Sequence, residues 1–210
     1  MHKMIKEMKV TPVVLEGRRV RLEPLESAHL SQLADAALDP ALWRWLAPPV
    51  RTREEMVAYV ESALDEQDRG VSLPFVLVER AEERVIGSTR YGNIDQQRRC
   101  LDIGWTWVEK EWERVAGATE AKYLLLKHAF EELRCIRVGL RSSTVTDWMN
   151  MLTRDAILST RTFDEDGSED QVSVANSRIR HDVHFSIVES AWPRVKERIE
   201  RMLRSREVLT

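Results

Sequence analysis

Segments of alternating or continuous apolar residues predict strands along much of the chain. The first alternation covers 18–25. A polar turn at 81–83 separates two further apolar runs, at 74–80 and 85–94, and this arrangement predicts a hairpin. A last run at 179–188 predicts the closing strand of the sheet.

A strand is also predicted at 99–109, and its two-residue period assigns its side chains to two faces. One face is expected to carry Leu101, Ile103, Trp105 and Trp107. The opposite face is expected to carry Asp102, Gly104 and Thr106.

Apolar residues three or four positions apart predict helices between these strands. Thr52 with Glu55 three residues later is a capping-box pattern, and the helix that it starts is expected to stop near Gly70. The clearest helical pattern covers 119–133. Further helices are predicted after Ser27 as a cap, from Asp39 to Leu46, at 147–159, and after Ser190 as a cap.

The helix at 119–133 lies between predicted strands at 99–109 and 135–140, which is the order of a parallel crossover unit. The strands before it are expected to pair antiparallel. This mixture predicts an α+β fold on one sheet rather than a doubly wound fold. Residues 1–10 are expected to form an N-terminal tail, and 11–206 a single domain.

Composition narrows the functional classes. The chain has 210 residues, 43% hydrophobic and 32% charged, so it can bury a core, and its net charge of −3 argues against a nucleic-acid partner. Two cysteines, Cys100 and Cys135, are too few for a disulfide scaffold or a cysteine-rich zinc site. His181 and His184 fall on opposite strand faces, so no metal site is expected. Without a signal core or an apolar run near ~20 residues, we expect a cytoplasmic protein with no membrane partner.

The segment from Arg114 to Thr119, between the 99–109 strand and the next helix, is rich in small residues. Small side chains allow a ligand to approach the backbone closely. The first N–H groups of a helix lack partners within the helix, so a pyrophosphate can bind there. An ordinary tight turn into a helix accounts for the same residues equally well.

Several separate segments, in the same order along the chain, resemble the GNAT N-acetyltransferases, and most closely the branch that includes ribosomal-protein N-terminal acetyltransferases. These segments are LEGRRVRLEPL, VIGSTRYGNID, LDIGWTWV, ATEAKYLLLKHAFEELRCIRV and RIRHDVHFSIVESAWPRVK. The resemblance covers nearly the whole chain. It implies the GNAT fold, with a mixed, mostly antiparallel central sheet and helices on both faces, and acetyl-CoA as the co-substrate with no metal.

The family's pyrophosphate loop reads Arg or Gln, two residues, Gly, one residue, and Gly or Ala. Arg114 and Gly117 match its first two positions but put Thr119 last, whereas anchoring on TEAK puts Glu113 first and alanines at the other two. We favour the TEAK register, in which the Glu113 carboxylate would repel a pyrophosphate and the neighbouring Arg114 would supply the cation. The residues expected to bind the cofactor here are Arg114, Val115, Ala116, Gly117, Ala118 and Thr119.

The segment from Asn150 to Ile157 is similar to the family's Asn-x-x-Ser-x-x-Ala-Ile. The resemblance implies that Asn150 holds the pantetheine arm, a task that suits an amide because it both donates and accepts hydrogen bonds. Thr153 replaces the family's serine and is expected at the cofactor. Many GNAT enzymes use a tyrosine as the general acid where Ile157 stands, so Thr153 or water would take that role. The family's Leu-Gly-Ala is replaced by Thr160, Arg161 and Thr162.

The resemblance also implies that the 99–109 strand separates from its neighbour and that acetyl-CoA lies in the gap. Backbone groups near Trp107 and Val108 would then bind the pantetheine amides. The N–H of Val108 is expected to stabilise the thioester oxygen as it becomes an oxyanion.

Asp102 is the first candidate for the base that takes a proton from the acceptor amine, since the branch often has an acid before Ile-Gly-Trp. The alternative is a structural carboxylate paired with an arginine such as Arg90 or Arg99. Glu109 and Glu111 are weaker candidates for the base.

Trp43 and Trp45 fall in a segment that borders the acceptor cleft in this family, and with Trp105 they are expected to bind the acceptor. Cation–π attraction to a cationic amine would favour that role, although core packing is the alternative for at least one of them. The resemblance thus implies an acetyl-CoA-dependent N-acetyltransferase that acts by direct attack of a primary amine, either a protein N-terminus or a small amine. The alternative is a catalytically degenerate GNAT-fold module for binding or assembly, and a homodimer is compatible with either.

Overall fold

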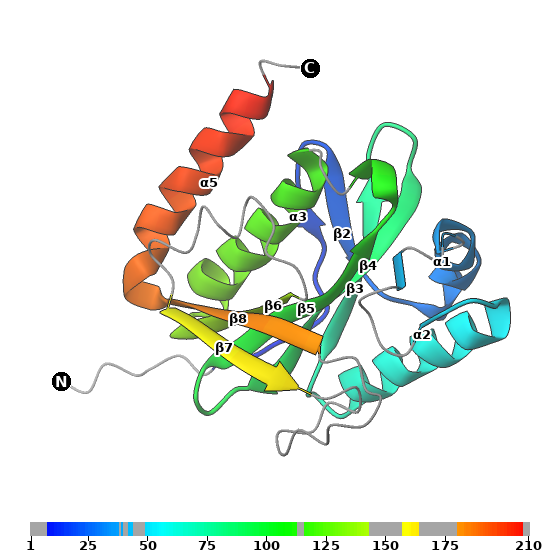
Figure 1. The fold of residues 1–210 in the computed structure, drawn as a ribbon, viewed down its shortest axis with the longest axis horizontal. Coiled ribbons are helices and arrows are strands. Elements are labelled where there is room, and N and C mark those ends of the chain that lie inside the picture. Colours follow the sequence, from blue (N-terminus) through cyan, green and yellow to red (C-terminus); the bar gives the residue numbers. More distant parts are fainter. Residues whose placement is uncertain are drawn as a thin grey trace.

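The apolar segments pair into one sheet of eight strands, in the order β1-β2-β3-β4-β5-β6-β8-β7 (Figure 1). This count applies to the residues that the computed structural model describes, namely 8–37, 39, 42–43, 49–112, 116–142, 157–163 and 180–207. The strands are β1 (Leu15–Glu16), β2 (Val20–Pro24), β3 (Leu73–Glu79), β4 (Arg84–Asp95), β5 (Cys100–Val108), β6 (Arg137–Ser142), β7 (Ile157–Phe163) and β8 (Arg180–Val188). Neighbouring strands pair antiparallel, except that β5 and β6 are parallel.

Helices cover both faces of this sheet (Figure 1). On one face, here called the α3 face, α3 (Ala116–Lys127) and α5 (Trp192–Glu207) pack against the sheet and each other. On the other, the α2 face, lie α1 (Leu30–Ala36) and α2 (Arg53–Asp68). Two separate apolar cores result, one between each helical layer and the sheet.

The α+β fold, the hairpin and the crossover predicted from the sequence are confirmed. β3 and β4 pair antiparallel across the polar turn, and α3 joins β5 to the parallel strand β6. At the start of α2, the Thr52 hydroxyl accepts from the Glu55 backbone N–H, while the Glu55 carboxylate accepts from the Thr52 N–H. The capping box therefore forms as its two residues predict.

Several local predictions are wrong. Residues 157–159, expected to end a helix, belong to β7, because they pair with β8 from Ile157 to Phe163. Ser27 and Ser190 do not cap their helices but lie inside short 3-10 turns that precede α1 and α5. The helix expected from Thr119 already begins at Ala116, and after Lys127 it continues as a π-helical turn.

The range 1–10, expected to form an N-terminal tail, includes one residue that lies in the core. Met8 is buried in the core of the α3 face, where its sulfur lies 3.9 Å from Sγ of Cys135. Burial of an apolar side chain stabilises the folded chain, so Met8 contributes to this core. Residues 147–156 of the helix predicted at 147–159, and most of the helix predicted from Asp39 to Leu46, lie outside the described residues.

Candidate active site

β5 and β6 run side by side for only part of their length. Their parallel pairing extends from Cys100 opposite Arg137 to Ile103 opposite Leu140. Beyond this point β5 continues to Val108 along β4, whereas β6 continues to Ser142 along β8. Within the described chain, the two strands therefore separate after Ile103, as the resemblance implies.

A β-bulge lies in β5 where the two strands separate. Between the cross-strand pairs Ser88–Trp107 and Arg90–Gly104, β4 has one residue while β5 has two, Trp105 and Thr106. Trp105 takes a φ of 50°, which a bulky side chain rarely adopts outside such irregularities. The extra residue reverses the faces of everything that follows it in the strand.

This reversal corrects the expected faces of β5. Leu101 and Ile103 belong to the core of the α3 face, but Trp107 belongs to the core of the α2 face. Val108 in turn packs into the α3 face. Because the backbone N–H of Glu109 donates to the carbonyl of Ile86 on the β4 side, strand alternation directs the N–H of Val108 to the β6 side.

Asp102 lies on the α2 face, since its neighbours Leu101 and Ile103 point into the other core. Its Oδ2 accepts a hydrogen bond of 2.8 Å from Nδ2 of Asn93. A Cβ atom placed on Gly139, the residue opposite it on β6, would collide with Oδ1. Among the described residues the partner of Asp102 is thus an asparagine, not the arginine that the structural alternative proposed.

Arg90 is a buried cation on the same face, with only 5% of its side chain exposed. Its Nη1 lies 3.0 Å from Oε2 of Glu66 on α2. Its guanidinium carbon lies 5.0 Å from the ring centre of Tyr59 and 5.6 Å from that of Trp105. Sequence reasoning considered Arg90 only as a partner for Asp102, although an arginine within an otherwise apolar strand pattern is a usable signal.

Trp43 packs in the core of the α2 face and is 4% exposed. Its ring centre lies 5.8 Å from that of Tyr59 and 5.3 Å from that of Trp107, and its Nε1 donates to the carbonyl of Ala37. The core-packing alternative therefore describes Trp43, in place of the expected wall of an acceptor pocket. Trp45 lies outside the described residues.

The N-terminus of α3 begins at Ala116, next to the separating strands, and its first N–H groups belong to Ala116, Gly117, Ala118 and Thr119. A Cβ on Gly117 would meet the Trp112 ring at 2.8 Å and Val20 at 3.1 Å, so the missing side chain makes room for protein. Any contact of Gly117 with a ligand would use its backbone. Glu113, Arg114, Val115, Asn150 and Thr153 lie outside the described residues.

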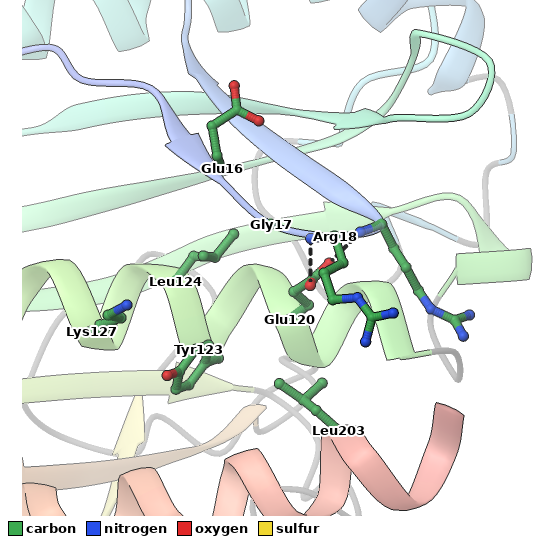
Figure 2. Close-up of a pocket in the computed structure, with 9 residues that line it drawn as sticks. Glu16, Gly17, Arg18, Glu120, Tyr123, Leu124, Lys127 and Leu203 are labelled. Atoms are coloured by element: carbon green, nitrogen blue, oxygen red, sulfur yellow. Dashed lines mark hydrogen bonds between the residues drawn. The ribbon is translucent and has the colours of Figure 1, made fainter. Parts of the chain in front are cut away.

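Glu120, in the second turn of α3, has a role that the sequence did not indicate. Its carboxylate accepts three backbone hydrogen bonds, from Arg18 at 2.8 Å, Arg19 at 2.8 Å and Val20 at 3.1 Å. Figure 2 shows the Glu120 carboxylate against the turn at Arg18. A cavity of about 370 Å³ lies beside this turn, between α3 and Leu203 of α5 (Figure 2). None of the residues that line this cavity is a predicted site residue.

Glu109 and the two cysteines lie in surroundings of other kinds. Glu109 forms an ion pair with Arg84, which raises the pKa of that arginine above its ordinary value. Both cysteines are buried, and burial raises the pKa of the Cys135 thiol to about 12.

In the described part of the chain, no three His, Cys, Asp or Glu side chains gather where they could hold a metal ion. No helix in that part is long and apolar enough to span a membrane.

The family model described as an acetyltransferase (GNAT) domain matches residues 19–154. A putative acetyltransferase from T. thermophilus is 30% identical, with a TM-score of 0.73 over 93% of this chain and 100% of that one. A GCN5-related N-acetyltransferase from Brucella melitensis is 24% identical, with a TM-score of 0.77 over 97% of this chain and 90% of that one.

A RimL ribosomal L7/L12 α-N-protein acetyltransferase, solved with coenzyme A, has the same fold. It is 14% identical to this chain, with a TM-score of 0.67 over 85% of this chain and 99% of that one. A search of curated proteins finds no match.

Proposed function

Because this chain belongs to the GNAT acetyltransferase family and is an N-acetyltransferase, we propose that it transfers acetyl from acetyl-CoA to a primary amine by direct attack in a ternary complex. The observation that carries this proposal is the separation of β5 from β6 after Ile103, next to the N-terminus of α3. The acceptor would be a protein N-terminus or a small amine, and the reaction would take place in the cytoplasm.

Two features of the described chain fit acetyl-CoA. The N–H groups at the start of α3 carry partial positive charge, and they suit a pyrophosphate. β5 stops pairing with β6 after Ile103 but continues along β4. The backbone groups of β5 that point to the β6 side would therefore bind pantetheine amides. Asn150 and Thr153 would complete this contact, and Arg114 would supply a cation.

When bound, acetyl-CoA supplies a thioester whose carbonyl carbon takes the amine and whose thiolate leaves. The residues of this chain would stabilise the developing negative charge and accept the proton of the amine. The N–H of Val108, directed to the β6 side, would stabilise the developing oxyanion. Such a donor acts through the backbone, so the type of side chain at 108 does not decide it.

Asp102 would accept the proton of the attacking amine, directly or through water. An α-amino group has an ordinary pKa of about 8 and a lysine of about 10.4, so the former needs less assistance. The hydrogen bond from Asn93 holds one carboxylate oxygen, and the other lies over Gly139, where a side chain would collide with it. The ring of Trp105 lies over Gly92, the residue opposite Asp102 on β4. This arrangement supports a base on the α2 face.

Direct transfer needs no acyl-enzyme, and the described cysteines support that route. Cys135 is fully buried, and its raised pKa keeps the thiol protonated at neutral pH. Cys100 is also buried at the start of β5. Neither thiol has the exposure that an acyl carrier requires.

The RimL-like fold supports an acceptor of the N-terminal type, as the sequence segments suggested. One alternative rests on a specific observation: Glu113 stands where the family has Arg or Gln, and Ile157, at the position of the family's tyrosine, belongs to a strand. These departures favour a GNAT-fold module that has lost catalysis and serves in binding or assembly.

Calorimetry with acetyl-CoA, followed by thiol release with a panel of primary amines, separates the two functions. Heat of binding together with amine-dependent thiol release is the result expected of the enzyme. Binding without release from any amine would favour the degenerate module. If the protein neither binds acetyl-CoA nor releases thiol with any amine, that result would contradict acetyl transfer.

A further inference from the structure

Arg90, in the middle of the α2 face, has a hydrogen-bond donor that lacks an acceptor in the described part of the chain. Its Nη1 donates to Glu66, but its Nε is buried, and no acceptor for it lies among the described residues. A buried donor without a partner is costly, and native proteins contain few of them. An oxygen atom that is not part of the described chain would remove this cost.

The surroundings of Arg90 select what can approach it. The faces of Tyr59 and Trp105 that point to Arg90 are occupied by its own guanidinium group, at 5.0 and 5.6 Å. A cationic amine therefore cannot use these ring faces and would meet a positive charge behind them. The carboxylate of Glu66 and the ring of Trp105 are both partly exposed, so the cluster reaches the surface.

Arg90 also lies at a useful distance from the proposed base. It stands opposite Gly104, and Asp102 stands opposite Gly92, so the two side chains are diagonal neighbours on one face of a regular antiparallel pair. Such neighbours have Cβ atoms about 7–8 Å apart. One residue of an extended peptide spans ~3.5 Å, so one small molecule is long enough to bring an amine to Asp102 and a carbonyl oxygen to Arg90, beside the Trp105 ring that lies over Gly92.

We propose that Arg90 binds the acceptor, donating from Nε to a carbonyl or carboxylate oxygen a few bonds from the attacking amine. This inference rests on the proposed function and narrows its acceptor class. The substrates would be amino acids, their amides or peptide N-termini, in preference to alkylamines and polyamines. Glu66 and Tyr59 would be positioning residues that hold the guanidinium group in place.

The test compares L-alaninamide with isopropylamine, which lacks the carboxamide. For each amine, kcat/KM is measured by thiol release and corrected to the concentration of the neutral amine, because the two amines differ in pKa. We expect a preference of at least about tenfold for L-alaninamide, since a hydrogen bond from a charged group is among the stronger ones. Equal corrected values would contradict the inference and leave the proposed function intact.

Arg90→Lys keeps the charge but removes Nε and the planar group that lies between the rings. We expect its kcat/KM for L-alaninamide to fall about ten times more than that for isopropylamine, with the change mainly in KM. Arg98 is an exposed arginine in the β4–β5 turn. Arg98→Lys is therefore the matched control and should keep the wild-type preference for L-alaninamide.

A merely structural role for Arg90 would lower both rates equally, and that result would contradict the inference. Acetyl-CoA affinity and the melting temperature of the variant are measured alongside. If Arg90→Lys does not fold, the wild-type comparison decides alone. Failure to bind acetyl-CoA or to acetylate any amine would overturn the proposed function and this inference together.

Discussion

Asp102 and Asn93 join two strands through their side chains, with Nδ2 of Asn93 donating to Oδ2 of Asp102 over 2.8 Å. Asn93 adopts a φ of 49°, a conformation that asparagine tolerates better than most residues, at an irregular part of β4. The other carboxylate oxygen lies over Gly139 on β6. The carboxylate of one β5 residue thus contacts both neighbouring strands, β4 and β6, beside the point where β5 and β6 separate.

Asp102→Asn should slow turnover by about 10²–10⁴-fold, the usual contribution of a general base. The amide keeps an oxygen that can accept from Asn93, so the fold should persist. Thiol release with a reactive amine measures the rate, and calorimetry should give an unchanged affinity for acetyl-CoA. Asp95→Asn, at the end of β4, is the control that should keep full activity. Unchanged turnover in Asp102→Asn would remove Asp102 from the role of base.

Gly139→Ala should displace the Asp102 carboxylate, because the added methyl group occupies the place of Oδ1. Overpacking of this kind typically costs about 1–3 kcal/mol, which denaturant unfolding can measure. Combining it with Asp102→Ala removes the colliding atoms, so the double variant should recover most of the loss. Additive costs would show that the two residues do not share this space.

Glu120→Gln should lower the free energy of unfolding by about 2 kcal/mol, because a carboxylate that accepts three backbone hydrogen bonds is replaced by an amide with one acceptor oxygen. Urea unfolding gives the value. The control is Glu132→Gln, an exposed residue of the turn that follows α3, which should change stability little. Equal stabilities of the two variants would contradict the role of Glu120 in holding the turn before β2.

Trp43→Ala should cost about 3–5 kcal/mol of stability, as expected when a buried aromatic residue is truncated. Trp43→Phe keeps a ring against Tyr59 and Trp107 but loses the bond to the Ala37 carbonyl, so it should cost less. Equilibrium unfolding monitored by circular dichroism ranks the two. A Trp43→Ala protein as stable as the wild type would contradict core packing and revive the acceptor role.

Acid should destabilise the protein in part through His128. Its Nδ1 lies 3.2 Å from the hydroxyl of Tyr91, and because that hydroxyl donates to the Leu125 carbonyl, its oxygen is left to accept from Nδ1–H. Burial lowers the pKa of His128 below its ordinary value of about 6.5.

Below pH ~6.5, His128 therefore takes up a proton more readily in the unfolded chain than in the folded one. The stability contributed by neutral His128 is complete above pH ~6.5 and is lost as the pH falls. Melting temperatures of His128→Gln should decline less than those of the wild type between pH 7 and pH 5. Parallel declines in the two proteins would show that His128 does not contribute.

Local features of the chain were predictable because they depend on residues close together in sequence. The capping box needs only Thr52 and Glu55, and the hairpin of β3 and β4 needs two apolar runs and a polar turn. The parallel strand β6 follows from a helix of suitable length between two strands. The position of Asp102 on a strand beside the separation could also be inferred, by resemblance.

The sequence alone thus determined the α+β fold, the order of most elements and the family, since periodicity and motifs are written in neighbouring residues. Only the tertiary structure decided the bulge at Trp105, the face of Trp107, the pairing of Asp102 with Asn93 and the burial of Arg90 between Tyr59 and Trp105. Each of these depends on which strands and helices meet across the sheet. A side chain's partner on another element leaves no periodic trace in its own segment, so no local pattern could predict it.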